Sequence, residues 1–224
     1  TTADDVSATS TGKTTKISVT AFDAVANYAV AYANVAQYAK IEGGVMDIGG
    51  ALTVDSVITD SLAKAFVGAA ANVSLVNVKT NSALSYSTIT SGANITGGTI
   101  KASSVNVTST SVNGESIAEA KSDNTWSMVV MGHLEAEARS HDNVNATISG
   151  AAIDATNSIN ITAKGNTKAD AKTQGSAIAI GDDSSATAKA YIGHSTSDAN
   201  RQRVNASIGA NATLVAGRNI TVYA

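Results

Sequence analysis

The chain has 224 residues, of which 43% are apolar, 4% aromatic and 15% charged, and its formal net charge is −3. This mild acidity argues against a nucleic-acid-binding surface. The chain contains no cysteine, which excludes disulfides and thiolate metal sites, and no apolar run near the roughly 20 residues that span a bilayer. It also lacks proline, so every residue keeps its backbone N–H for long hydrogen-bonded ladders.

Residues 1–16 open the chain and are polar without any periodicity. We expect them to form an N-terminal edge segment or a partial repeat, followed by a single repetitive β-solenoid domain over residues 17–224. The chain begins with threonine rather than methionine, so we expect it to be a processed or excised piece whose signal peptide would no longer be visible.

Residues 20–40 have two interpretations. Phe22, Val25, Ala29, Tyr32 and further residues follow a helical spacing after a Thr-x-x-Asp capping pattern, which indicates an amphipathic helix. The alanines of the same segment also alternate, and the segment occupies the place that alternating strands take later in the chain. We favour the strand and keep the helix as the alternative.

A short strand-like phrase then recurs along the chain and serves as an anchor. The intervals between its third residues are 54−19=35, 107−54=53, 161−107=54 and 220−161=59. Long, nearly constant periods with a β-type anchor predict stacked β units. The sequence therefore predicts an all-β fold, a parallel β-solenoid of about four repeats of 35–59 residues. The anchors expected to stack in register are Ile17–Thr20, Leu52–Asp55, Val105–Thr108, Ile159–Thr162 and Asn219–Val222.

Alternating small residues fill the stretches between anchors. We align Ala169–Lys172 with Ala118–Lys121 and with Ala63–Phe66, and the closing strand Val144–Gly150 with Val204–Gly209. Period-2 alternation indicates strands with one face in and one face out. Glycines at 43–44, 49–50, 97–98, 150 and 209 fall where tight corners are expected, because glycine tolerates positive φ.

Asparagine is uncommon inside strands, yet it recurs inside the anchor phrase at Asn106, Asn160 and Asn219. Equivalent asparagines in a stack can hydrogen-bond to one another along the axis. We therefore predict an axial ladder formed by these three residues.

The chain has one concentration of aromatic residues, formed by Phe22, Tyr28, Tyr32 and Tyr38. They could form an interaction surface, either a sugar-binding platform or a subunit contact, because tyrosine is favoured at interfaces. The alternative is that they pack over the first coils as a cap.

No catalytic, cofactor-binding or metal-binding residues are predicted. His133, His141 and His194 lack metal-ligand spacing, and no Gly-x-Ser-x-Gly elbow is present. The pairs Asp4–Asp5 and Asp182–Asp183 are adjacent carboxylates, and we expect the second pair to lie in a turn after Gly181. Calcium at such a turn stays open because hard oxygen ligands are abundant, although the nonapeptide calcium-binding repeat is absent.

The phrases Ser176–Gly181 and Ala186–Ala190, with the closing run Ala212–Thr221, resemble the repeats of large bacterial exoproteins. The most similar are the filamentous-haemagglutinin type and the leukotoxin-family filamentous adhesins. The resemblance covers most of the chain from Ile17. It implies a right-handed parallel β-helix, secretion across an outer membrane and a position at the bacterial cell surface, and it supplies no catalytic residues. The long alternating stretch between anchors departs from the shorter coil of filamentous haemagglutinin.

Two functions follow from these patterns. The first is a non-enzymatic extracellular structural or adhesive module, a stiff solenoid that stacks head to tail, continues into a longer chain, or binds a surface glycan or protein. Residues 220–224 carry no charge that would block edge pairing. The alternative is a carbohydrate-active β-helix enzyme of the lyase or hydrolase type. We align Glu119 with Asp170 as equivalent positions of two repeats, which favours a repeating surface over a singular acidic site.

Overall fold

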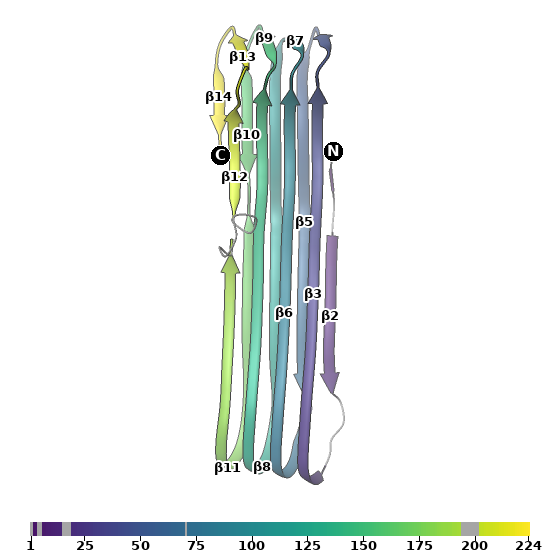
Figure 1. Cartoon of the computed structure of the whole chain (residues 1–224), viewed down its shortest axis with the longest axis vertical. Helices are drawn as coiled ribbons and strands as arrows, with labels where there is room; N and C mark the ends of the chain where they lie inside the picture. The colour runs from purple at the N-terminus through teal and green to yellow at the C-terminus, as the bar shows by residue number, and fades with distance from the viewer. Residues whose placement is uncertain (1, 4–5, 15–18, 70, 194–201) are drawn as a thin grey trace.

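A computed structural model describes residues 2–3, 6–14, 19–69, 71–193 and 202–224, and the described residues contain strands and no helix. Five of the strands have 19 to 46 residues, the others are much shorter, and all pairings are parallel (Figure 1). No helix of the described chain has the length and apolar character that crossing a membrane would need. In chain order the strands are β1 (Thr2–Ala3), β2 (Val6–Thr14), β3 (Val19–Glu42), β4 (Val45–Asp47), β5 (Ala51–Ala69), β6 (Asn72–Thr96), β7 (Thr99–Ala102), β8 (Ser104–Ser149), β9 (Ala152–Ala155), β10 (Ile159–Lys164), β11 (Thr167–Ile192), β12 (Arg203–Ile208), β13 (Thr213–Ala216) and β14 (Ile220–Tyr223).

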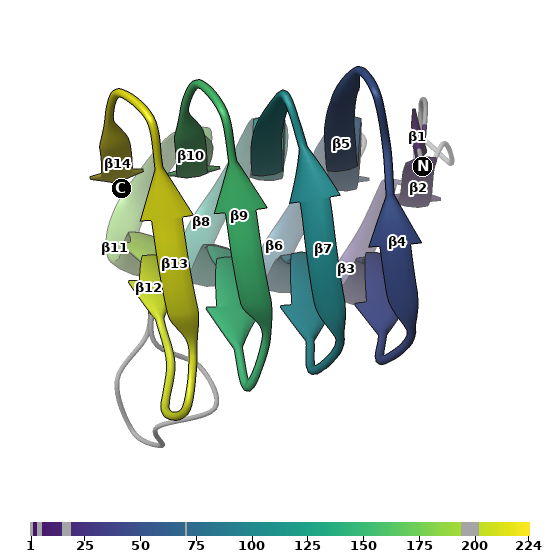
Figure 2. The ribbon, with the colours of Figure 1, turned by 90° about the horizontal axis from the view of Figure 1, so that it is seen from above.

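Each coil of this parallel β-solenoid has two long legs and one short strand. In β8, residues 104–122 form the descending leg and pair with β5, and residues 125–149 form the ascending leg and pair with β6. The short strands β4, β7, β9 and β13 form a separate four-stranded sheet that closes one end of the coils (Figure 2). The all-β solenoid predicted from the sequence is confirmed, with coils drawn out into a flat, elongated cross-section.

The anchor register is confirmed for three of the five phrases, whereas the C-terminal phrase stacks with a shifted register, because Ile220 was expected opposite Ile161 and lies opposite Ile159. Leu52, Val105, Ile159 and Ile220 lie opposite one another in successive coils, at offsets of 105−52=53, 159−105=54 and 220−159=61 residues. The last coil is longer because eight additional residues lie between β11 and β12. From Ile192 to Arg203 there are 11 positions, whereas their partners Ser140 and Asn143 are three apart.

The phrase Ile17–Thr20 is not an anchor, so that prediction is wrong. Its described residues, Val19 and Thr20, begin the ascending strand β3 and pair with Val73 and Ser74 rather than with β5. The short interval of 35 residues to the next phrase reflects this different place in the coil. The strand interpretation of residues 20–40 is confirmed, because β3 is extended throughout and buries Ala29, Ala31 and Ala33 on its inner face.

The alignment of the alanine runs is shifted by two residues from the one expected. Ala171 lies opposite Ala118, and Ala118 lies opposite Ala65. Because the strand period is two, such a shift leaves every inward residue inward, so the pattern alone cannot detect it. As a result Glu119 lies opposite Lys172 and not opposite Asp170, which corrects the expected equivalence of the two acids.

The residue types of the core change along the legs. Beside the short sheet it is filled by valine and isoleucine, including Val107, Ile100, Ile148 and Ile153. Further along, the buried side chains between the two legs are mostly alanine and serine, such as Ala118 and Ala136, with Val67 among them. Small side chains let the two sheets approach closely without leaving voids. Buried serines bridge this layer, as where the Ser116 hydroxyl donates to the Ser85 hydroxyl at 2.8 Å.

The corner that precedes each short strand needs a left-handed backbone. Gly43, Gly97 and Gly150 have φ of 68°, 72° and 62°, and Asn211 takes the same role in the last coil with φ of 59°. Positive φ is strained for most residues, and asparagine is among those that tolerate it best. The stacked corners therefore explain why Gly-Gly and Gly recur at this point of the repeat.

Candidate functional surfaces

The predicted aromatic residues lie together on the outer face of β3. Phe22, Tyr28, Tyr32 and Tyr38 are 49–63% exposed, so they do not pack into the interior of the first coil. Their even spacing places them on one side of the strand, opposite the buried alanines. Whether this strip binds a ligand or a subunit stays a prediction, but its position on the outside fits such a contact.

One tyrosine of this strip begins a column that crosses four coils. Tyr32 lies opposite Tyr86, Tyr86 opposite Arg139, and Arg139 opposite Tyr191. The first two rings stack with centroids 4.9 Å apart and an interplanar angle of 11°. The Arg139 guanidinium carbon lies 5.6 Å from the Tyr86 ring centre and 5.4 Å from the Tyr191 ring centre, which is cation–π distance.

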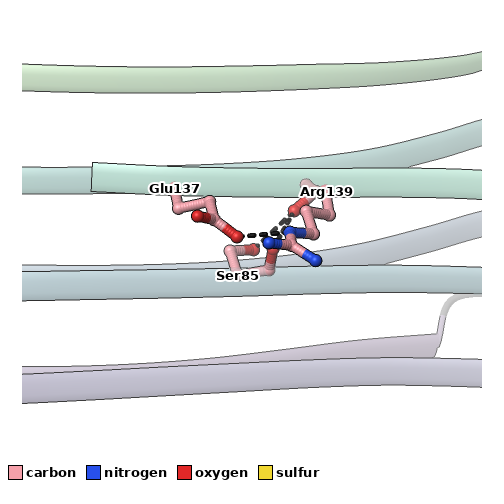
Figure 3. Close-up of polar contacts among 4 residues, drawn as sticks. Ser85, Glu137 and Arg139 are labelled. Carbon is pink, nitrogen blue, oxygen red and sulfur yellow. Dashed lines mark hydrogen bonds and ion pairs between the residues drawn. The ribbon is translucent and has the colours of Figure 1, made fainter. Parts of the chain in front are cut away.

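Glu137 neutralises the cation of this column. It forms an ion pair with Arg139 two residues along the same strand, and the two side chains point toward each other beside Ser85 (Figure 3). Burial raises the pKa of Tyr86 and the Glu137 carboxylate raises it further, while Arg139 opposes the rise. Sequence reasoning missed this column. Its signal was present in the intervals 86−32=54, 139−86=53 and 191−139=52, which match the coil period.

The asparagine ladder forms in part. The Asn160 side-chain amide donates to the Asn106 side-chain oxygen at 2.9 Å, as expected. The prediction is wrong for Asn219, because the register places Thr221 opposite Asn160. A second asparagine contact, not predicted, joins Asn205 to Asn145 at 2.8 Å on the ascending legs. On the descending legs Lys168 and Glu115 form an axial ion pair at 2.8 Å.

A lysine is buried near the end of the legs that lies opposite the short-stranded sheet. Lys79 is 3% exposed, and its ammonium group donates to the Thr125 hydroxyl at 2.6 Å. Burial lowers its pKa, while the carboxylates of Asp23 and Asp123 oppose that change. A cavity of about 200 Å³ adjoins the lysine, and Val130, Leu134 and Asp182 are among its lining residues.

A carboxyl group is buried in the ascending leg of β8. Asp142 is fully buried, and desolvation raises its pKa to about 6. Polar groups of Ser111, Gln202, Asn166 and Thr167 surround it and act in the opposite direction. Neither carboxyl oxygen completes a hydrogen bond, so desolvation dominates.

Space for this carboxyl is left by two glycines. A Cβ at Gly114 would lie 3.0 Å from Asp142 Oδ1, and one at Gly165 would lie 3.4 Å from Oδ2. Sequence reasoning did not single out Asp142, because a lone acid in an alternating strand carries no motif.

The residues considered for catalysis or metal binding do not converge. Asp182 and Asp183 lie within strand β11, not in the expected turn, and adjacent strand residues point to opposite faces. His133 contacts the Ser185 hydroxyl at 2.8 Å. Burial lowers the pKa of His141, whereas His194 and the pair Asp4–Asp5 lie outside the described residues. Within the described part of the chain no three His, Asp or Glu side chains come close enough to hold a metal.

Comparison with known proteins gives no match: no family model, no curated protein and no solved structure is significantly similar to this chain.

Proposed function

We propose that this protein is a non-enzymatic structural or adhesive module, a segment of a stiff β-solenoid fibre. The observation that carries the proposal is that the outer side chains contact their equivalents in neighbouring coils. Polar and aromatic groups bond one coil to the next along the axis, and they do not gather around one point as an active site requires. These axial contacts are Asn160–Asn106, Asn205–Asn145, Lys168–Glu115 and Tyr32–Tyr86.

Stiffness follows from the coil geometry. Neighbouring coils are joined by parallel backbone ladders that run over most of each leg, as in the pairing of β6 with β8. Bending or shearing such a stack strains many hydrogen bonds at once. A position outside the cell, at a bacterial surface, is part of the proposal and rests on the resemblance of the repeats to filamentous adhesins.

The end faces of the stack support assembly with further coils. Strand β11 is exposed along much of its length, and all four residues of β14 are exposed. Val222 continues an inward apolar column formed by Val54, Val107 and Ile161, and is itself 44% exposed. An uncovered strand edge is a template for further pairing. We propose that further coils cover these edges, either from a longer polypeptide or from a second copy stacked head to tail, which is an open heterologous contact.

Light scattering and electron microscopy of the 224-residue protein over a range of concentrations test the assembly. Val222→Lys places a charge on the end face, and the matched control Thr108→Lys places one on the outer side of an inner coil opposite Asp55. We expect rods that lengthen with concentration for the parent and for Thr108→Lys, and short particles for Val222→Lys. Particles of one length at every concentration, unaffected by either substitution, would contradict head-to-tail assembly.

The non-enzymatic part of the proposal is tested separately. The purified protein is incubated with pectins, alginates and glycosaminoglycans, and unsaturated products and reducing ends are measured. We expect no release above the buffer control. Reproducible release that is lost in Asp182→Asn or Asp183→Asn would instead support the carbohydrate-active alternative.

A further inference from the structure

An apolar surface lies on the outside of the ascending legs, beside the far turn of the coils (lower end in Figure 1). In its first column Val73 lies opposite Trp126, and Trp126 lies opposite Ile178. A second column lies two residues further along each strand and contains Leu75, Met128 and Ile180. The residues on both sides of them are in register, as in the pairs Ser74–Ser127 and Val76–Val129. We call the six residues the tip surface: Val73, Leu75, Trp126, Met128, Ile178 and Ile180.

The members of the tip surface are strongly exposed, from 48% for Val73 to 86% for Ile180. Phe22, Val129 and Met131 extend the apolar area along the neighbouring outward positions. Single exposed apolar residues are ordinary, but contiguous patches on soluble proteins usually mark an interaction site.

The inner side at the same level is largely polar, with Val130 beside the polar residues, so the usual pattern of a strand is largely inverted here. Asn72, Asn77 and Lys79 are buried between the legs, and Asn72 donates a hydrogen bond to Asp23. Folding alone favours apolar residues inside and polar residues outside. Elsewhere on the same legs the interior is mainly alanine, serine, valine and isoleucine, with few exceptions such as Asp142, and the exterior is largely polar or aromatic. Packing of the core therefore does not explain the exposed apolar residues at the tip.

Charge selects the kind of partner. The segments that surround the tip surface, residues 19–24, 71–79, 122–133 and 175–185, contain Asp23, Asp123, Asp182 and Asp183 against Lys79. Their formal charge is 1−4=−3, equal to that of the whole chain. Lys79 is buried, and Asp23 and Asp182 share its inner side, because they lie opposite the buried residues Asn77 and Val130. Asp123 and Asp183 are exposed, and Asp183 lies opposite the outward Met131. The outside of the tip is thus apolar with an acidic border formed by Asp123 and Asp183.

From this combination we propose that the tip surface docks a cationic amphipathic segment of a partner protein, whose apolar side chains cover the two columns while lysine or arginine residues meet the acidic border. An anionic lipid surface would be repelled by the same carboxylates. A second copy placed face to face would bring its own acidic border against this one.

Trp126 provides the readout, because it is the single tryptophan of the chain and is 58% exposed on the tip surface. The probe is a tryptophan-free amphipathic peptide of leucine and lysine, with a leucine–glutamate peptide of the same pattern as its control. We expect a saturable blue shift with the lysine peptide only, weakened by 1 M salt because the Debye length falls to about 3 Å.

The matched variants separate the surface from a general effect. Ile178→Ser with Ile180→Ser should weaken binding of the lysine peptide roughly tenfold or more. Ile192→Ser, an exposed isoleucine of the same strand remote from the tip, should leave binding unchanged.

Three results would overturn the proposal. The first is an equal response to both peptides, or to neither. The second is a blue shift on adding phosphatidylcholine or phosphatidylglycerol vesicles alone, which would assign the surface to lipid. The third is a blue shift that depends on protein concentration alone and is lost in the double variant, which would assign it to a second copy.

Discussion

The buried carboxyl of Asp142 makes the stability of this protein depend on pH in a direction opposite to that of most carboxylates. Its pKa rises from 3.8 to about 6 on folding because the side chain is desolvated. Below pH 3.8 the carboxyl is neutral in both the folded and the unfolded chain, so its burial does not lower the free energy of unfolding through ionisation. Between pH 3.8 and 6 the unfolded chain releases the proton while the folded chain keeps it, so stability falls as pH rises. Above pH 6 the carboxyl is ionised in both states, and the loss of stability caused by burying its charge is complete and no longer changes with pH.

The size of the penalty follows from the two pKa values. A difference of about two pKa units corresponds to about 3 kcal/mol. Asp142→Asn keeps the shape but cannot ionise, so it removes the pH-dependent part. Relative to the parent, the variant should gain about 2 to 3 kcal/mol in the free energy of unfolding between pH 4 and pH 7.5. The absolute value also contains the cost of an unpaired buried amide, about 1–3 kcal/mol, which does not vary with pH.

Urea unfolding of the parent and of Asp142→Asn, at half-unit steps over that range, measures the difference. Other titrating groups, including the neighbouring His141, are common to both proteins and cancel. Asp154→Asn, at an exposed position of β9, is the matched control and should change stability by less than about 0.5 kcal/mol at every pH. A parent–variant difference at Asp142 that stays constant from pH 4 to 7.5 would refute the reasoning.

Further predictions concern packing, corners and ladders. Ala136→Leu adds volume to the thin layer between the legs and should cost at least about 1–3 kcal/mol, or prevent folding, as measured by urea unfolding. Gly98→Ala should cost more than about 1 kcal/mol, because φ is +89° and the new Cβ would lie 2.7 Å from the Gly44 carbonyl oxygen, whereas a Cβ at Gly49 meets nothing within 4 Å and Gly49→Ala should be tolerated. Asn160→Ala should cost about 1 kcal/mol through the lost bond to Asn106, and a loss no larger than that of exposed Asn143→Ala would contradict the ladder.

The sequence was informative wherever the repeat carried distinctive residues. The Leu52, Val105 and Ile159 anchors and the closing strands at Val144 and Val204 were aligned correctly, because β-branched residues and glycine corners fix the register there. The alanine runs were misaligned by two positions, since equal small residues repeat with the strand period.

The surfaces were harder to predict than the fold. The aromatic residues of β3 could be named from composition, but the column from Tyr32 to Tyr191 depends on the register across four coils. Asp142 and Lys79 have no local motif, and only the structure places them in the interior. The inverted pattern at the tip also requires knowing which side of each strand faces inward.

The parallel, in-register stack of coils of about 53 residues is tested most directly by distances between spin labels, for which the absence of cysteine leaves a clean background. Labels at Thr108 and Thr162, which lie opposite each other in adjacent coils, should show strong dipolar broadening. Labels at Thr108 and Lys172 are displaced by 172−162=10 residues along the leg and should give a distance of roughly 33 Å. An unbroadened spectrum for the first pair, or strong broadening for the second, would contradict the stacked solenoid.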